Sequence, residues 1–578
     1  MPASTGNAGT GRPCPYVACV PACPGRDGGT ELQADSMTSV YAAFAATAQA
    51  SNARPFLHVP SSALGPDAAG PVELTYGEAL ARVDSLASIY RGRGYGSGHR
   101  VALLLENRPD FLLHFLALNA VGASIVPLNP DYRAAEFEYV LKHSEAGLAV
   151  AFPQHVTRLT GLGLPGLRVV PASEPFDLAP VVSKALEHAA GDTTECALLY
   201  TSGTTGKPKG CIISNFYCLN MGRHYNSEGG LCEVRAGEER LITPLPLFHM
   251  NALAASTTAM ILAGGCVVQL DRFHPKTWWS DVATSGATIV HYLGVMPAIL
   301  LGQPGDPHER AHRVRFGFGA NVNPKDHQAF EARFGFPLIE AWAMTETGGG
   351  AAITASREPR HVGTRCVGAP RPGIELRIVE DSGQDASEGA PGELLVRHAG
   401  PDPRIGFFSG YFKDEEATEY AWRGGWLHTG DVVRRGEDGQ IHFVDRSKNI
   451  IRRSGENIAA LEVEAALADH PAIRQIAVIP APDPVRDEEV MACIVPHAGA
   501  AITRETAISI QDLCLSRLAY YKAPGYVAFI ASLPTTATNK VQKMRLADFG
   551  ANPLGAPDCF DLRERKKRDA QRDAAGRG

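Results

Sequence analysis

Several features that would assign this chain to a specialised class of protein are missing from its sequence. The twelve cysteines include no CxxC pair, and the early group at positions 14, 19 and 23 has no histidine nearby to complete a zinc site. Disulfide frameworks are typical of short secreted chains rather than of one with 578 residues, so we expect reduced thiols and a cytoplasmic location. The N-terminal stretch MPASTGNAGTGRPCP has no apolar core, which argues against a signal peptide.

An excess of positive charge is also missing. The formal net charge is −7 and the isoelectric point is near 6.3, so we expect no nucleic-acid partner, which would favour a basic stripe. A basic run does occur at residues 563–568, and we interpret it as a solvated tail. Residues 241–270 contain no Asp, Glu, Lys or Arg, but two prolines, a histidine and an asparagine interrupt them. This stretch predicts a buried strand followed by a buried helix rather than a membrane span.

The first 445 residues divide into an extension and a large body. Residues 1–36 are rich in Gly, Pro, Ser and Thr and have no hydrophobic periodicity, so we expect disorder there. A helical pattern at residues 40–50 opens the body, and short apolar strands then alternate with helical patterns. This alternation predicts an α/β fold over residues 37–445, layered and built on mostly parallel sheets.

The character of the sequence changes after residue 445. A charged segment leads into a helical pattern at residues 461–469, two short apolar strands and another helical pattern near 506–518. This order predicts a small α+β domain over residues 446–550, followed by a basic tail over 551–578.

A glycine-rich segment, YTSGTTGKPKG, occupies residues 200–210, directly after an apolar run that predicts a strand. Hydroxyls, backbone amides and two lysines in one flexible turn suit a polyphosphate, because glycines let the backbone approach it and the cations offset its charge. The segment is not a Walker A loop, since Thr201 stands where the first glycine belongs and Pro208 follows Lys207. Taken alone, it leaves a flexible linker as the alternative.

Further motifs follow in a fixed order along the chain. They are EAWAMTET at residues 340–347, WLHTGD at 426–431, FVDR at 443–446 and LPTTATNKVQK at 533–543. Together with the glycine-rich segment, this set resembles the adenylate-forming superfamily of acyl-CoA synthetases, luciferases and peptide-synthetase adenylation domains. The resemblance covers about residues 37–550, and the ordered set is far more specific than any single motif. It implies the adenylate-forming enzyme fold, in which the small C-terminal domain is mobile.

The resemblance implies roles around the phosphates of ATP. Glu346 would bind a magnesium ion, with Thr204 beside it, and Thr345 would contact phosphate. Trp342 would stack on adenine. Trp342 and Ala343 stand where the family has tyrosine and glycine, which leaves the shape of the adenine pocket open.

The resemblance also implies how the rest of the nucleotide is bound. Asp431 and Arg446 would hold the ribose hydroxyls, since a carboxylate accepts well from two vicinal hydroxyls. The full predicted ATP- and AMP-binding set consists of Thr201, Ser202, Gly203, Thr204, Thr205, Gly206, Lys207, Lys209, Gly319, Ala320, Asn321, Trp342, Ala343, Met344, Asp431, Phe443 and Arg446.

The small domain would contribute a catalytic lysine and a hinge. Lys540 occupies the family's catalytic lysine position, with Asn539 in place of the usual glycine, and Lys543 is the alternative. Lys448 would be the hinge residue. The loop expected to line the CoA tunnel consists of Ser454, Gly455 and Glu456.

The acid substrate is the least determined part of the predicted site. His249 matches a family position beside the acyl pocket and joins Lys540, Glu346 and Thr345 in the predicted catalytic set. The predicted walls of the acyl pocket are His249, Leu293, Gly294, Val295, Phe318, Gly348 and Gly349. The stretches RRSGENIAALEVE and DPVRDEEVMACIV resemble the carnitine/crotonobetaine-CoA ligase branch.

The resemblance therefore implies an AMP-forming acid:CoA ligase. Such an enzyme converts a carboxylic acid and ATP to an acyl-adenylate and pyrophosphate, and then forms acyl-CoA and AMP. ATP, Mg²⁺ and coenzyme A would be required, and the only partner expected is a small carboxylic acid, with the chain a monomer or homodimer. The alternatives are a stand-alone adenylating enzyme, a luciferase-like oxidase and a non-catalytic binding protein on the same fold.

Overall fold

The computed structural model describes most of the chain. The described ranges are 37–64, 70–173, 176, 178–181, 185–186, 190–201, 207–322, 324–380, 382–446, 450–534, 543–556 and 558–567. Several predicted features lie outside them, namely the extension 1–36 and the residues Ser202, Gly203, Thr204, Thr205, Gly206, Lys448 and Lys540.

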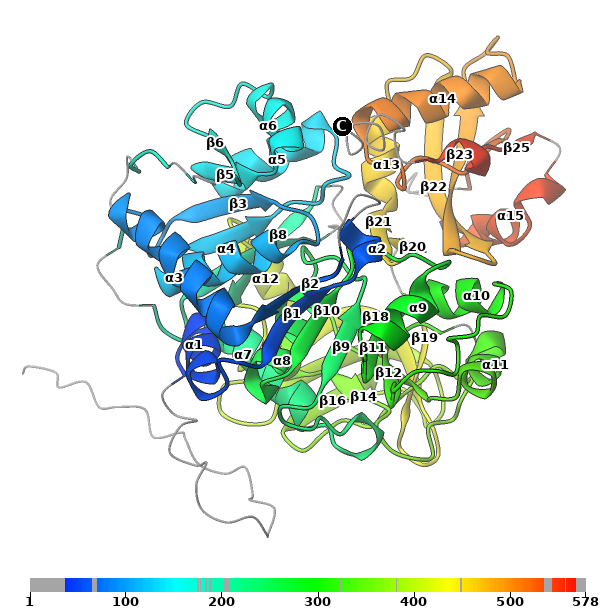
Figure 1. The fold of residues 1–578 in the computed structure, drawn as a ribbon. Coiled ribbons are helices and arrows are strands. Elements are labelled where there is room, and N and C mark those ends of the chain that lie inside the picture. The colour runs from blue at the N-terminus through cyan, green and yellow to red at the C-terminus, as the bar shows by residue number, and fades with distance from the viewer. Residues whose placement is uncertain are drawn as a thin grey trace, which may run out of the picture. The chain divides into compact units, whose positions relative to one another are not determined.

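The described residues form four sheets, of which the largest has eight strands in the order β14-β13-β12-β11-β9-β10-β1-β2 (Figure 1). Its inner strands are parallel and its two edge strands antiparallel. The parallel strands are apolar and almost wholly buried, as expected of a sheet covered on both faces. The strands are β1 (Pro55–Val59), β2 (Val72–Thr75), β9 (Arg240–Thr243), β10 (Cys266–Gln269), β11 (Ile289–Leu293), β12 (Phe316–Ala320), β13 (Leu338–Trp342) and β14 (Ile353–Thr354).

A second, six-stranded sheet has the order β6-β5-β3-β4-β7-β8 and is parallel except for the β7–β8 pair. The strands are β3 (Arg100–Leu104), β4 (Ser124–Pro127), β5 (Leu148–Ala151), β6 (Arg168–Pro171), β7 (Glu195–Thr201) and β8 (Lys209–Ser214). The strand predicted before the glycine-rich segment is confirmed as β7. Because Thr201 pairs with Lys209, both ends of that segment are held in register.

Helices cover the two parallel sheets (Figure 1). They are α1 (Val40–Ala50), α2 (Ser61–Leu64), α3 (Tyr76–Gly92), α4 (Pro109–Ala120), α5 (Ala134–Ser144), α6 (Pro153–Thr160), α7 (Asn215–Asn226), α8 (Thr257–Ala263), α9 (Trp278–Thr284), α10 (Val295–Leu301), α11 (Pro324–Phe334) and α12 (Glu415–Ala421). Helix α4 is apolar on all sides and is buried from Phe111 to Asn119, as such a pattern requires. Helix α7 begins after Ser214, whose side chain accepts from the backbone N–H of Tyr217.

The uncharged stretch at residues 241–270 is a buried layer of this body. It contains β9, the π-helical turn η3 (Asn251–Ser256), α8 and β10. The predicted strand and helix are confirmed, and a second strand follows them. Among the described residues, no helix has both the length and the apolar character needed to cross a membrane.

A third sheet departs from the expectation of parallel pairing. Its five strands follow the order β15-β19-β18-β17-β16 and are all antiparallel. They are β15 (Cys366–Gly368), β16 (Ile374–Val379), β17 (Gly392–His398), β18 (Leu427–Arg435) and β19 (Ile441–Arg446). This sheet carries two of the predicted ribose-binding motifs on its neighbouring strands β18 and β19.

The fourth sheet is built from residues after 449. Its strands are β20 (Ile450–Arg453), β21 (Glu456–Ala459), β22 (Ile473–Asp483), β23 (Asp487–Pro496), β24 (Tyr526–Phe529) and β25 (Cys559–Asp561), and its helices are α13 (Ala460–Leu467), α14 (Arg504–Arg517) and α15 (Ala547–Ala551). Alternate residues of β23 enter two different cores: Ala492 packs with Val463 of α13 and Ile510 of α14, and Cys493 with Leu546. Both faces of the sheet are therefore covered.

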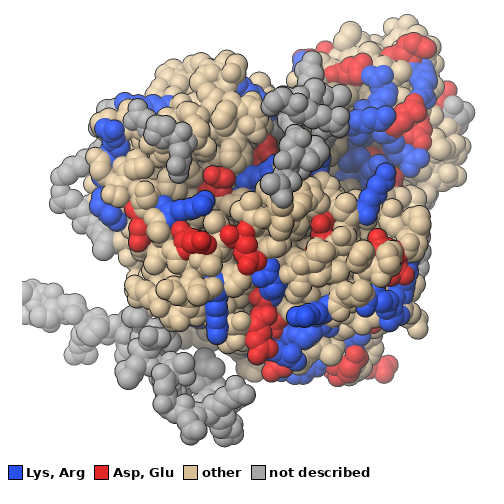
Figure 2. All heavy atoms as spheres, in the orientation of Figure 1, with Lys and Arg blue, Asp and Glu red and all other residues tan. Residues whose placement is uncertain are grey.

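The basic run at residues 563–568 is not simply a solvated tail. Strand β25 extends the fourth sheet beyond residue 550, where we predicted that the small domain ends. Lys566 is fully buried against the carboxylate of Glu489 and the carbonyl of Tyr521, and this burial lowers the pKa of Lys566 to about 7. The sequence around Lys566 gave no sign of this ion pair, because Glu489 lies 77 residues earlier in the chain. On the face of the molecule that Figure 2 shows, basic and acidic side chains are interspersed.

A buried ionic cluster connects the fourth sheet's domain to the large body. The ammonium of Lys522 donates to Glu136 of α5 at 2.6 Å and to Glu462 of α13 at 2.8 Å. Burial opposes the charge on this ammonium, but the two carboxylates raise the pKa of Lys522 above its ordinary value. Beside the cluster, the side-chain amide of Asn129 donates to the hydroxyl of Tyr521 at 3.0 Å. These contacts hold the fourth sheet's domain against the large body. The hairpin formed by β20 and β21 of that domain lines the cavity described next.

Candidate active site

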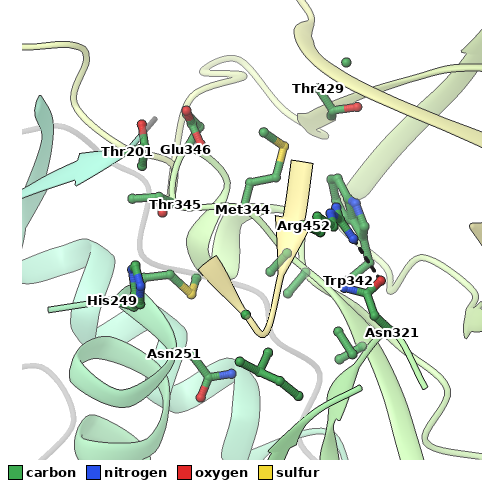
Figure 3. A pocket seen from close by; sticks show the side chains of 18 of the residues that line it. Thr201, His249, Asn251, Asn321, Trp342, Met344, Thr345, Glu346, Thr429 and Arg452 are labelled. Atoms are coloured by element: carbon green, nitrogen blue, oxygen red, sulfur yellow. Dashed lines mark hydrogen bonds between the residues drawn. The ribbon is translucent and has the colours of Figure 1, made fainter. Parts of the chain in front are cut away.

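A cavity of about 500 Å³ lies at the carboxyl ends of β11, β12 and β13. This is the edge of a parallel sheet at which α/β proteins usually bind ligands. Figure 3 shows residues from distant segments converging on it, including Thr201 at the end of β7, Glu346 after β13, Thr429 of β18 and Arg452 of β20. Of the predicted nucleotide set, the cavity is lined by Thr201, Lys209, Gly319, Ala320, Asn321, Trp342, Ala343 and Met344.

Glu346 lies at one end of the cavity, near Thr201 and Thr345 (Figure 3). Its Oε1 accepts a hydrogen bond of 2.8 Å from the hydroxyl of Tyr411, which sequence analysis missed. Tyr411 is also stacked against an ammonium, since Lys209 Nζ lies 4.7 Å from the centre of its ring. A hydroxyl, a carboxylate and a lysine thus meet where the glycine-rich segment returns to the sheet.

The donor set around Glu346 fits a magnesium ion that is bound partly by phosphate. Mg²⁺ usually takes one or two protein carboxylates and completes its octahedron with phosphate oxygens and water. Glu346 offers such a carboxylate to the cavity, and no cluster of three or more His, Cys, Asp or Glu ligands exists among the described residues. Thr204, the second predicted ligand, lies outside the described residues.

Trp342 is tied to the predicted ribose-binding carboxylate. The indole N–H of Trp342 donates to Asp431 Oδ2 at 2.9 Å, and both side chains are almost fully buried. Tyrosine, the family's residue here, has no donor at this place on its ring. Strands β18 and β19 pair Asp431 with Arg446, although the side chain of Arg446 is not described. The departure from the family motif therefore joins the residue predicted to stack on adenine to the carboxylate predicted to bind the ribose.

Replacing Trp342 with phenylalanine removes this hydrogen bond and keeps an aromatic face. We expect the KM for ATP to rise about threefold to tenfold, the size of one net hydrogen bond of about 1 kcal/mol. The KM for the acid should stay within about twofold. Steady-state kinetics with Trp422→Phe, which changes a buried indole outside the cavity lining, provides the control. An unchanged KM for ATP would show that the bond to Asp431 does not support nucleotide binding.

Buried Glu340 fixes the backbone of the segment after β12. Its carboxylate accepts from the backbone N–H of Asn321 at 2.9 Å and of Val322 at 2.7 Å. Burial raises the pKa of Glu340 to about 7, although these two hydrogen bonds oppose the shift. Asn321 has a left-handed backbone (φ 64°), which asparagine tolerates better than other side chains.

Arg452 of the hairpin β20–β21 lines the cavity near Trp342 (Figure 3). Its Nη1 donates to Asn321 Oδ1 at 2.9 Å, and its guanidinium carbon lies 5.0 Å from the ring centre of Phe443. Sequence analysis missed this residue because a basic segment after a hinge predicts a solvated surface. The only signal was its place two residues before Ser454, in the loop expected to enter the site.

The turn at Ser454 and Gly455 lines the same cavity. Gly455 has φ +87°, and a Cβ at this position would lie 2.2 Å from Leu293 Cδ1. Glu456 Oε2 lies 3.6 Å from His249 Nε2. The turn predicted to form the CoA tunnel is therefore beside two residues predicted to form the acyl pocket.

The acyl end of the cavity differs in part from the prediction. His249, Leu293, Gly294 and Phe318 do line it, whereas the side chain of Val295 is not described. The prediction for the glycine run was wrong. A Cβ on Gly348 would lie 2.3 Å from the ring of Tyr217, and one on Gly349 would lie 2.9 Å from Met221 Cα. These glycines allow α7 to pack closely. Met221, His224, Tyr225 and Asn251 are further lining residues that sequence analysis missed.

Family patterns cover most of the chain. The pattern described as AMP-binding enzyme matches residues 44–412, and the AMP-binding enzyme C-terminal domain matches residues 462–540. This chain belongs to the AMP-binding enzyme family. The recognition of an adenylate-forming enzyme and its fold from sequence is thereby confirmed.

Relatives within this AMP-binding family are named as acid:CoA ligases. The sulfoacetate–CoA ligase of Cupriavidus necator is 32% identical over 487 residues, which cover 82% of this chain and 92% of the relative. A crotonobetaine/carnitine–CoA ligase of Proteus mirabilis is 29% identical over 501 residues, covering 82% of this chain and 93% of the relative. These relatives confirm the predicted enzyme class, an AMP-forming acid:CoA ligase that uses ATP and CoA.

Among solved structures, the o-succinylbenzoate CoA synthetase of Bacillus subtilis is similar in two different complexes. The complex with the product analogue OSB-NCoA has a TM-score of 0.75 and 25% identity, covering 88% of this chain and 98% of that chain. The complex with the acyl-adenylate OSB-AMP has a TM-score of 0.61 and 25% identity, covering 87% and 97%. This chain is thus more similar to the complex with the product analogue.

Proposed function

We propose that this acid:CoA ligase carries out both half-reactions in the one cavity, with the residue roles set out below. The main observation behind this proposal is that residues of both domains line the same cavity. Trp342 and Glu346 of the large body line the same cavity as Arg452 and Gly455, which come from the fourth sheet's domain, and Asp431 accepts a hydrogen bond from Trp342. A nucleotide bound against the first group would present its α-phosphate near the second.

In the first half-reaction, an oxygen of the acid's carboxylate attacks the α-phosphorus of ATP. The acyl–O–P bond forms, the bond to the β-phosphate breaks, and pyrophosphate leaves. Two like charges approach each other, which costs several kcal/mol at about 4 Å in a partly desolvated site. Lys209 and Lys540 would offset this charge, and Thr345 would hold a phosphate oxygen. A magnesium ion bound by Glu346 would supply further charge neutralisation.

In the second half-reaction, the sulfur of CoA attacks the acyl carbon, and the acyl C–O bond to AMP breaks. The turn at Gly455 would form the wall along which the pantetheine arm reaches that carbon. The close approach of Gly455 to Leu293 and the higher TM-score against the product-analogue complex both support the thioester-forming arrangement for the described structure. Adenylation would then require rotation about Lys448 to bring in Lys540.

We also propose a division of the chain into a large and a small domain. The large domain covers residues 37–445, and the small domain begins at 446 and includes β25 and Lys566. A cytoplasmic location suits an enzyme that consumes ATP and CoA. The cysteines within the described residues are free thiols, and all but Cys559 are buried, which fits a reducing compartment.

The test is CoA-dependent AMP release across a panel of sulfonated, quaternary-ammonium, aromatic and medium-chain carboxylic acids. We expect at least one acid to give AMP and acyl-CoA in equal amounts and to support pyrophosphate exchange without CoA. Glu346→Gln and Asp431→Ala should lower both activities by about 10²-fold or more. If no acid releases AMP, or if an amine replaces CoA as the efficient acceptor, the proposed function is wrong.

A further inference from the structure

The acyl end of the cavity combines apolar walls with a set of polar groups. Met221 and Phe318 supply apolar surface there. His224 of α7, Asn251 of η3 and Thr354 of β14 also line this cavity. A pocket for a simple alkyl or aryl acid would have no need of these polar groups, and each buried polar group without a partner costs about 1–3 kcal/mol.

The orientation of the Asn251 amide is fixed from behind. His291 is fully buried, and burial lowers its pKa to about 3, so the ring is neutral and carries one N–H. The hydroxyl of Tyr225 lies 2.9 Å from Nε2 of His291, and Asn251 Oδ1 lies 2.9 Å from Nδ1. The hydroxyl of Ser256 also lies 2.9 Å from Nδ1 and donates to the backbone carbonyl of Asn251 at 3.1 Å. A donation from Tyr225 to Nε2, with Nδ1–H shared between Oδ1 of Asn251 and Oγ of Ser256, is consistent with all four residues. The amide oxygen of Asn251 is then used, and its NH₂ group faces the cavity, as Figure 3 shows.

Thr354 supplies a second polar group that has no protein partner. Its side chain is buried, with 7% of the residue exposed, and Oγ1 has no hydrogen-bond partner among the described residues. The chain just after it contacts the segment that follows α7, because the carbonyl of Ser356 accepts from the N–H of Leu231. The chain after Thr354 thus leads to the segment that follows α7, and Thr354 lines the same cavity as His224.

His224 is held by a buried ionic cluster. Its Nε2 lies 2.8 Å from Oε1 of Glu228, a carboxylate that is 2% exposed. Arg371 lies 3.8 Å from the same oxygen and also donates to the backbone carbonyl of His224 at 3.1 Å. Glu228 thus lies between an imidazole and a guanidinium. Of these three residues only His224 lines the cavity, and with Nε2 turned to Glu228 its Nδ1 is the nitrogen left for a ligand.

We propose that His224, Asn251 and Thr354 form a subsite for a second, anionic acceptor group, a carboxylate or sulfonate, at the tail of the acid substrate. Two amide N–H groups and a hydroxyl can donate to such a group, and an imidazolium held between Glu228 and the anion donates from both of its nitrogens. The apolar walls between this subsite and the adenylate site accommodate a short aliphatic or aromatic spacer. The inference rests on the proposed ligase function and names its class of substrate.

The test compares acids that differ only at the tail. Succinate is paired with 4-methylpentanoate, and glutarate with 5-methylhexanoate, so that an isopropyl group replaces the second carboxylate. The wild-type enzyme should favour the dianion of at least one pair by tenfold or more in kcat/KM. His224→Leu and Thr354→Val should each lower kcat/KM for that dianion, by at least tenfold and about threefold respectively, while changing the apolar partner by less than twofold. Most of the loss should be in KM for the acid.

Met221→Leu is the matched control, since it changes a side chain of the same helix and cavity without a polar group. It should affect both members of a pair alike. Preference for the apolar acids, or equal losses for both members in His224→Leu and Thr354→Val, would overturn the subsite while leaving the ligase function intact. If no member of either pair and no acid of the wider panel releases AMP, the ligase function itself is wrong.

Discussion

The Gly455→Val enzyme should form acyl-adenylate at close to the wild-type rate and should form acyl-CoA about 100-fold more slowly. Two properties of Gly455 lead to this expectation: its φ of +87° and the 2.2 Å that would separate a Cβ from Leu293 Cδ1. A β-branched residue pays at least about 1–2 kcal/mol for the left-handed backbone alone, and its side chain would also displace the turn from the cavity. A 100-fold loss corresponds to about 2.7 kcal/mol, which these two costs together supply.

The measurement separates the half-reactions. Pyrophosphate exchange reports adenylation, and rapid-quench conversion of supplied acyl-adenylate with CoA reports thioester formation. Gly439→Val is the control, because Gly439 has φ +81° but a Cβ there would meet nothing within 4 Å. Leu293→Ala combined with Gly455→Val should recover part of the lost rate, since it removes the clash and leaves the backbone strain. Equal losses in both half-reactions would contradict the assignment of this turn to CoA.

The Lys540→Ala enzyme should show the opposite pattern. Loss of a preorganised cation at the reacting phosphate should slow adenylation by at least about 10²-fold, whereas thioester formation from supplied acyl-adenylate should continue. Pyrophosphate exchange and the same rapid-quench assay measure the two rates. If Lys540→Ala damages both steps equally, Lys540 is not a first-step residue.

Lys543, the rival to Lys540 in the sequence, provides the control for this experiment. Its ammonium lies 2.5 Å from Glu464 Oε1 and is 12% exposed, so it is engaged within the small domain. We therefore expect Lys543→Ala to leave the ratio of the two half-reactions unchanged. A selective loss of adenylation in Lys543→Ala would transfer the role to that residue.

Sequence identified the parts of the site whose chemistry is local. The glycine-rich segment, the carboxylate Glu346 and the pair Trp342 and Asp431 belong to short motifs in which nucleotide chemistry restricts neighbouring residues together. The apolar strands were predictable for the same reason, because parallel strands buried on both faces need continuous hydrophobic runs. The all-antiparallel third sheet was not predicted, since α12 stands between β17 and β18 as a crossover helix would, although these two strands pair antiparallel.

The parts that sequence missed depend on contacts between distant segments. Tyr411 is 65 residues from Glu346, to which it donates, and Arg452 is 131 residues from Asn321. Neither pairing leaves a local pattern. We expected the glycines at 348 and 349 to leave room for the acyl group. Small residues indicate that another group packs closely against them, and here that group is α7. His224 is an exception, since its partner Glu228 is only four residues away, and what the sequence did not indicate is that the carboxylate of Glu228 is buried.

The proposed reaction passes through an acyl-adenylate, whose acyl carbon is attacked by CoA. The most direct test follows a carboxylate oxygen of the acid into AMP. An acid found active in the panel is labelled with ¹⁸O in both carboxylate oxygens and converted with ATP and CoA in a single turnover. The AMP released should carry one ¹⁸O and the pyrophosphate none, because one carboxylate oxygen remains on the α-phosphorus when the thioester forms. Unlabelled AMP, or label in a product of cleavage at the β- or γ-phosphate, would contradict the proposed reaction.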